Sequence, residues 1–241
     1  MKTKKQLFQR YILYKMLFMR RKSMLCKQKM QMFLDNNIVI KDSALKRIRL
    51  DIVGKNNTIV ISDSANLKSD IHIFGDNNCV YIDDNVVSAG SLYMLIGQNH
   101  HNFGPVHNCE IKIGKNTSFE STSIIVKNSN ARVKIGDDCV FAFDIMLYHT
   151  DSHPVFDLHS GKIINWVKDM CIGNHVWIGA KTTILKNTQI ADDCIVGWGA
   201  TVSGKFDTEH CVIAGNPARV VKTNITWASD GSKGYVQNEG N

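Results

Sequence analysis

A polar segment at residues 147–157, which reads LYHTDSHPVFD, holds the side chains best suited to acid–base chemistry. It contains two histidines, His149 and His153, and two aspartates, Asp151 and Asp157. Histidine is a natural general base because its pKa lies near the usual working pH. Such a base is commonly oriented by a third group, and Asp151 is close enough in sequence to do this, although a backbone carbonyl could serve equally well. The segment is therefore a candidate for proton transfer, and a plain surface loop is the alternative.

This segment interrupts a regular repeat with a period of six residues. The repeated apolar positions are Ile172, Ile178, Ile184, Ile190, Val196 and Val202. Small or β-branched residues stand between them at Val176, Thr182, Thr188, Cys194 and Ala200. A helix would need a period near 3.6, and an ordinary strand would show a period of two. A period of six predicts a solenoid whose triangular coil has three short sides and about 18 residues.

A looser form of the repeat precedes the polar segment. The run IVGKNNTIVI at 52–61 is echoed 21 residues later by IFGDNNCVYI at 73–82. Gly, Asn and Asp recur between the apolar runs, and these residues tolerate the positive φ angles that tight turns require. The solenoid is thus expected to begin near residue 50.

The run CIGNHVWIGAKTTILKNTQIADDCIVGWGATVSGKF, followed by VIAGNPARVVK, resembles the hexapeptide-repeat acyltransferases. The resemblance extends over residues 50–222 and is strongest over 145–222. Within the family, the chain resembles the capsule and sialic-acid O-acetyltransferases and the galactoside and maltose acetyltransferases. It implies an all-β solenoid that is a left-handed parallel β-helix, with an extended catalytic loop.

The chain is accordingly divided into three parts. A basic amphipathic helical segment is expected at 1–45 and the β-helix acyltransferase domain at 46–222, with the loop 147–169 inserted in it. Residues 223–241 form a C-terminal tail.

The resemblance implies a catalytic role for His153, which is followed by Pro154 and precedes Trp177 by 24 residues (177 − 153 = 24). Family members place their catalytic histidine in such a loop and pair it with this tryptophan. Trp177 is expected beside the acetyl group and the acceptor, and a hydrophobic contact between subunits is the alternative. His149 is the second choice, either as a substitute base or as a group that orients the substrate.

The resemblance also assigns contacts with coenzyme A. The corresponding residues are Ala180, Trp198, Ser203, Lys205, Arg219 and Lys222. The first two fall where backbone groups meet the pantetheine arm. The next two stand near a Thr-Lys pair of family members, and here Gly204 separates the two residues. The last two fall where basic side chains meet the nucleotide phosphates, and ordinary solvated charges are the alternative.

The function implied is acetyl-CoA-dependent O-acetylation of a sugar hydroxyl, in a bacterial capsular polysaccharide that could contain sialic acid, or in its precursor. The resemblance implies a homotrimer with its sites between subunits, and no metal. Alternatives are an amino-sugar N-acetyltransferase, a scaffold without activity, and a zinc-dependent carbonic-anhydrase-like protein. The zinc hypothesis draws on six histidines, His100, His101, His107, His149, His153 and His175, but their spacing does not match that family.

Charge is concentrated at the N-terminus. Residues 1–34 hold ten basic residues and no acidic one, so the remainder carries 19 − 22 = −3. Nucleic acid is therefore not expected as a partner. Apolar residues recur three or four positions apart over 5–33, which predicts an amphipathic helix. It could cap the solenoid, contact an anionic membrane or polyanion, or do both.

The remaining composition favours a cytoplasmic protein. A peripheral position on the inner membrane is the alternative. The seven cysteines include no CxxC pair and fit small, reduced core residues. Lys15 breaks the apolar run near the N-terminus, and RRK follows where a signal peptide would have small residues.

Overall fold

The computed structural model describes residues 31–41, 44, 47–98 and 104–229. Of the helix predicted at 5–33, only residues 31–33 lie within these ranges, and they belong to a helical segment at 31–35. All ten basic residues of the stretch 1–34 lie outside the described residues. In the described ranges, no helix is both long and apolar enough to cross a bilayer.

The strands form three sheets, which we call sheets A, B and C. Sheet A contains, in spatial order, β1 (Asn37–Val39), β3 (Thr58–Ile61), β5 (Cys79–Ile82), β8 (Glu110–Ile113), β11 (Arg132–Ile135), β14 (Met170–Ile172), β17 (Gln189–Ile190) and β20 (Lys205–Phe206). Sheet B contains β2 (Ile48–Val53), β4 (Ser69–Phe74), β7 (Leu92–Ile96), β10 (Thr122–Val126), β13 (Ile145–His149), β16 (Thr183–Leu185) and β19 (Thr201–Val202). Sheet C contains β6 (Val87–Ser88), β9 (Ser118–Phe119), β12 (Val140–Phe141), β15 (Trp177–Ile178), β18 (Ile195–Val196), β21 (Cys211–Gly215) and β22 (Ala218–Thr223).

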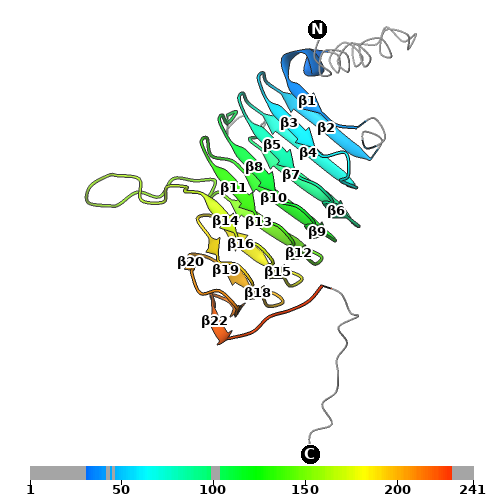
Figure 1. The fold of residues 1–241 in the computed structure, drawn as a ribbon. Coiled ribbons are helices and arrows are strands. Elements are labelled where there is room, and N and C mark those ends of the chain that lie inside the picture. Colours follow the sequence, from blue (N-terminus) through cyan, green and yellow to red (C-terminus); the bar gives the residue numbers. More distant parts are fainter. Residues whose placement is uncertain (1–30, 42–43, 45–46, 99–103, 230–241) are drawn as a thin grey trace, which may run out of the picture.

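From β5 onward, each coil runs from sheet A to sheet C, then to sheet B, and back to sheet A one level along the axis (Figure 1), whereas β1 to β4 alternate between sheets A and B. Consecutive coils pair in parallel, and only β22 turns back antiparallel on β21. The triangular section therefore has an A–C corner, a C–B corner and a B–A corner. These corners determine where functional side chains can stand.

The apolar positions of the six-residue repeat fill the interior. All six of the predicted Ile and Val positions between residues 172 and 202 are buried, and so are the small residues between them. In longer strands such as β13, buried and solvent-facing residues alternate because neighbouring side chains point to opposite faces of a sheet. The prediction that the six-residue repeat marks side chains pointing into a solenoid is confirmed.

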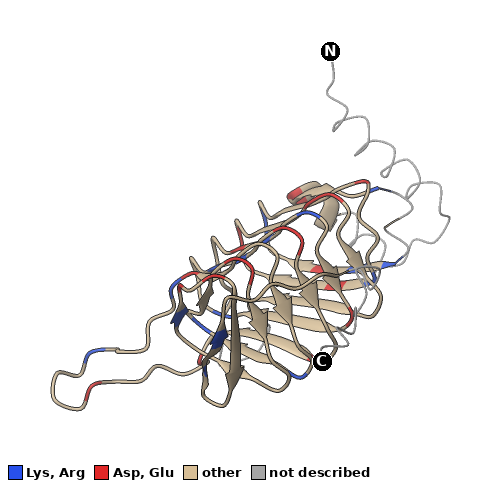
Figure 2. Cartoon of the chain, turned by 60° about the horizontal axis from the view of Figure 1, so that its bottom comes forward, with Lys and Arg blue, Asp and Glu red and all other residues tan. Residues whose placement is uncertain are grey.

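Polar residues make the corners. Most non-glycine residues with positive φ are Asn or Asp, for example Asn77 (φ 60°) and Asp138 (φ 56°). Inside the first coils, the buried amides of Asn36, Asn57 and Asn78 form a hydrogen-bonded ladder from coil to coil. Figure 2 shows that, in the described part of the chain, charged residues gather at the turns, whereas the broad strand faces carry few.

Candidate active site

The polar segment forms a long excursion at the B–A corner. It leaves sheet B at the end of β13 and re-enters sheet A at β14, and it projects well away from the solenoid (Figure 1). A bridge between Phe156 and Ile163 pairs the two legs of the excursion. A backbone hydrogen bond from Asp157 N to Lys162 O (2.8 Å) continues this pairing, so residues 150–169 form an ordered arm.

Lys186, from the turn after β16, holds the base of this arm. Its ammonium lies 2.9 Å from Asp151 Oδ2 and donates to Asn165 O at 2.8 Å. Asn165 Nδ2 in turn donates to Asp151 Oδ2 at 2.7 Å. Because Asp151 and Asn165 stand on opposite legs, one largely buried lysine fixes both. Burial alone would raise the pKa of Asp151, but the hydrogen bonds from Lys186 and Asn165 outweigh it and lower that pKa.

His153 is exposed at the base of the arm, and its backbone is fixed on both sides. Its N–H donates to Asp151 O at 2.7 Å, and its carbonyl accepts from Asn165 Nδ2 at 2.9 Å. A small hollow of about 150 Å³ lies at this point and is lined by His153, Pro154 and Trp166, among others. The expected role of Asp151 as the group that orients the imidazole stays a prediction, and its carboxylate contributes to the clamp with Lys186.

His149 has a different environment. It ends β13 on the inward face of the strand, and its side chain is completely buried. Burial lowers its pKa to about 4, partly offset by the charge of Asp169, so the ring is neutral at pH 7. A group inside the solenoid cannot meet an acceptor hydroxyl, and this argues against His149 as a substitute base.

An apolar groove of about 710 Å³ runs along the outside of sheet C to the C–B corner. Its lining includes the predicted residues Trp177, Ala180 and Trp198. Small residues leave the groove open, and Gly179 is required there because an added Cβ would lie 2.7 Å from Val196 O and 2.8 Å from Trp198 N. An apolar groove of this size suits an extended pantetheine arm.

The other residues assigned to CoA divide between two places. Arg219 and Lys222 are exposed on β22, in the same sheet as Trp177. Ser203 and Lys205 lie instead at the B–A corner, between β19 and β20, where Lys205 forms an ion pair with Asp207 (2.9 Å). Sheet B separates this corner from the groove.

The sequence did not point to two residues that contribute to the site, Lys186 and Trp227. The C-terminal segment after β22 crosses back over the A–C corner, where Trp227 Nε1 donates to His175 O at 2.9 Å. The indole stacks on the His175 ring, with centroids 4.2 Å apart, and lies 6.1 Å from the ring of Trp177. An isolated tryptophan in a polar tail was the available signal for this contact. The segment therefore places a second tryptophan ring beside Trp177.

Metal ligands do not assemble in the described residues: no three His, Cys, Asp or Glu side chains lie close enough together to bind an ion. His100 and His101 fall outside the described ranges.

Fold and groove together define a parallel β-helix of the acyltransferase type. A relative from Escherichia coli O1:K1 / APEC, named polysialic acid O-acetyltransferase, is 37% identical over 119 residues, which make up 49% of this chain and 38% of that protein. A polysialic acid O-acetyltransferase of Neisseria meningitidis is 33% identical over 145 residues, 58% of this chain and 67% of that one. No family model matches the chain.

The solved structure of the polysialic acid O-acetyltransferase OatWY superposes with a TM-score of 0.68 and 30% identity, covering 81% of this chain and 89% of that one. The chain belongs to the hexapeptide-repeat acetyltransferases, together with these relatives. The left-handed parallel β-helix expected from the sequence is thereby confirmed.

Replacing Lys186 with Met should loosen the arm, because Asp151 and Asn165 O would lose their shared donor. We expect cleavage within residues 150–169 by a limiting amount of protease to become about tenfold faster, in line with the loss of one charged hydrogen-bond network. Lys162→Met, at the exposed end of the arm, is the matched control. Equal cleavage rates for the two variants would show that Lys186 does not hold the arm.

His149 should make the fold sensitive to acid. The unfolded chain takes up a proton near the ordinary pKa of 6.5, whereas the folded chain resists protonation until about pH 4. Stability from this group is therefore complete above pH 6.5 and falls as the pH drops toward 4, by roughly 3 kcal/mol in total. Urea unfolding at pH 7 and pH 4.5 should show a smaller loss for His149→Leu than for the wild type. Parallel losses would contradict the assignment.

Proposed function

We propose that the chain transfers the acetyl group of acetyl-CoA to a hydroxyl of a capsular polysaccharide, with a sialic-acid polymer as the preferred acceptor. The observation that carries this proposal is the apolar groove that brings together Trp177, Ala180 and Trp198. The names of the two relatives, both polysialic acid O-acetyltransferases, support the choice of acceptor.

His153 is the proposed general base. Its imidazole takes the proton of the acceptor hydroxyl while that oxygen forms a bond to the thioester carbonyl carbon. The carbon–sulfur bond then breaks, and the imidazolium returns the proton to the departing CoA sulfur. No group is oxidised or reduced. The clamp formed by Lys186, Asp151 and Asn165 supports this role because it fixes the backbone of the histidine.

Within one chain, the base and the groove stand at opposite edges of sheet B. His153 lies at the B–A corner, and Trp177 and Trp198 line a groove that ends at the C–B corner. A single subunit therefore does not bring them together, and a neighbouring copy must supply one of them. We infer that the enzyme is a homotrimer with three such shared sites, which closed rotational symmetry allows.

The outer face of sheet B supports this assembly. One register column along it starts with Asp51 and His72 and continues as an apolar stretch, here called the apolar column, of Leu95, Ile125, Tyr148 and Leu185. If this face points to a threefold axis, the B–A corner of each subunit meets the C–B corner of the next. Packing of the apolar column at the axis would also remove it from water.

The projecting arm provides a second apolar surface. Its exposed side chains are Val155, Phe156, Leu158, Ile164 and Trp166. In a trimer this arm can lie over the groove of the neighbouring subunit, which would cover both apolar surfaces and bring His153 toward that groove.

A cytoplasmic location is proposed, and its variant, peripheral contact with an anionic membrane, depends on residues 1–34. Most of these residues lie outside the described ranges, so the contact stays a prediction. Binding to vesicles rich in anionic lipid should weaken when residues 1–34 are deleted, and unchanged binding would contradict it.

Replacing His153 with Ala should lower kcat for acetyl transfer by about 10²–10⁴-fold, because the hydroxyl would lose its base. The affinity for acetyl-CoA should change by less than about twofold, since the groove is unaltered. Release of free CoA thiol in the presence of a sialic-acid polymer measures the first quantity, and calorimetry measures the second.

The matched control is His159→Ala, at the exposed end of the same arm, which should retain wild-type kcat. Undiminished transfer by the His153 variant would rule out its role as the base.

A further inference from the structure

A second surface, on the outside of sheet A, carries chemistry that the catalytic groove does not use. Strand register places Val60, Tyr81, Lys112 and Lys134 in one column on adjacent strands β3, β5, β8 and β11. All four point outward, because they alternate with fully or almost fully buried residues. Adjacent strands are about 4.8 Å apart, so these side chains form a continuous row along the solenoid axis.

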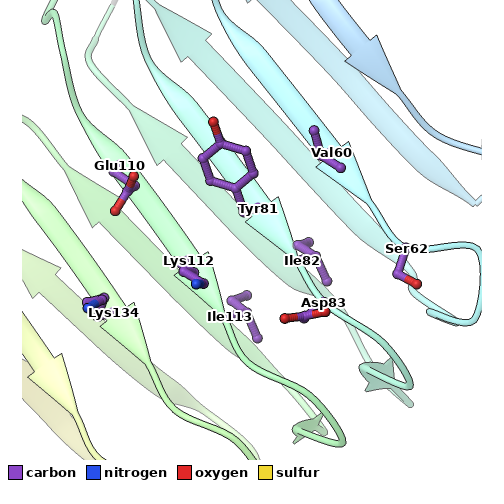
Figure 3. A pocket seen from close by; sticks show the side chains of 9 residues that line it. All are labelled: Val60, Ser62, Tyr81, Ile82, Asp83, Glu110, Lys112, Ile113 and Lys134. Atoms are coloured by element: carbon purple, nitrogen blue, oxygen red, sulfur yellow. The ribbon is translucent and has the colours of Figure 1, made fainter. Parts of the chain in front are cut away.

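The row lines a hollow of about 570 Å³ that also includes Ser62, Asp83 and Glu110. Figure 3 shows the ring of Tyr81 with its broad face toward the viewer, and Lys112 and Lys134 following it on the next two strands. A flat aromatic face beside two ammonium groups is a surface on which a sugar ring can stack while its carboxylate is neutralised.

The two lysines are not neutralised by close protein partners. They are directly opposite each other in the sheet, an arrangement of like charges that is destabilising. Among the described residues, no carboxylate oxygen lies within 4.0 Å of either ammonium. Glu110 is instead the register partner of Arg132. The pair is therefore available to an external anion.

We propose that Tyr81, Lys112 and Lys134 form a binding subsite for a carboxylate-bearing sugar unit of the acceptor polysaccharide, remote from the reacting hydroxyl. The identity of the polymer rests on the proposed function. The two ammonium groups bind the carboxylate, and the tyrosine ring packs against the pyranose.

The position of the row connects it to the active site. β11, which carries Lys134, pairs directly with β14, the strand on which the catalytic arm ends. A polymer that leaves His153 at the B–A corner can thus continue over sheet A. Binding at this second point raises the local concentration of the remaining hydroxyls near the base and favours long acceptors over short ones.

The test compares the double variant Lys112→Gln/Lys134→Gln with a control of equal charge change, Lys55→Gln/Lys68→Gln, whose lysines are exposed and lie outside this row. Binding to polysialic acid of high chain length is measured directly and without acetyl-CoA. We expect the Kd of the Lys112/Lys134 variant to rise about tenfold or more, with a weaker dependence on salt, and that of the control to change little. A separate Tyr81→Val variant, which repeats the residue of its neighbour Val60, should also bind more weakly.

Steady-state kinetics separates this inference from the proposed function. The Lys112/Lys134 variant should have a raised KM for the polymer and an unchanged KM for acetyl-CoA and for a short sialic-acid oligomer. Equal losses in the control pair, or an equal loss of binding to single-stranded DNA, would overturn the subsite in favour of general attraction to anions. If the wild type binds the polymer through these residues but acetylates nothing, the proposed function fails and the subsite stands.

Discussion

Parallel pairing between successive coils is the constraint on which the rest of the structure depends. Each strand must match the one a coil earlier, so every coil repeats the same three directions and the same inward positions. The interior is thereby filled with stacked apolar side chains and has no space for a substrate. Chemistry is confined to the outer faces and to insertions at the corners. The arm at residues 150–169 is the largest such insertion in the described chain.

The same constraint underlies the proposed division of the active site between two subunits. A rigid triangular section keeps its corners apart by the width of a sheet, and no small movement of one chain can bring the B–A corner to the C–B corner. Sharing between subunits solves this geometric problem, because rotation about an axis facing sheet B brings unlike corners together. In the proposed trimer, the contacts of Lys186 with Asp151 and Asn165 would hold the base of the arm while its far end lies on a neighbouring subunit. The proposed subsite on sheet A follows from the same geometry, because a row of side chains along the axis spans several coils and could contact a long acceptor.

The sequence predicted those parts of the fold that repeat, and it was weak where a contact occurs once. Period six specified the buried positions from Ile172 to Val202, whereas Trp177, Ala180 and Trp198, which line the groove, were expected at the site only from the family resemblance. The stacking of Trp227 on His175 could not be foreseen, because 52 residues separate the partners and nothing in the local pattern links them. His149 also shows the limit of residue type as evidence: two histidines four positions apart have opposite environments, because one ends a strand facing inward and the other stands beyond it.

The most direct test of the shared site is complementation between two inactive chains. His153→Ala and Trp177→Ala chains are each confirmed to be inactive, then mixed in equal amounts during refolding or co-expression, and acetyl transfer to the polymer is measured. If the two residues of one site come from neighbouring subunits, about a quarter of the sites in randomly mixed trimers contain both intact residues, and about a quarter of the wild-type activity returns. If one chain supplied both residues to the same site, no site would be complete, and activity would remain at the level of the parent variants.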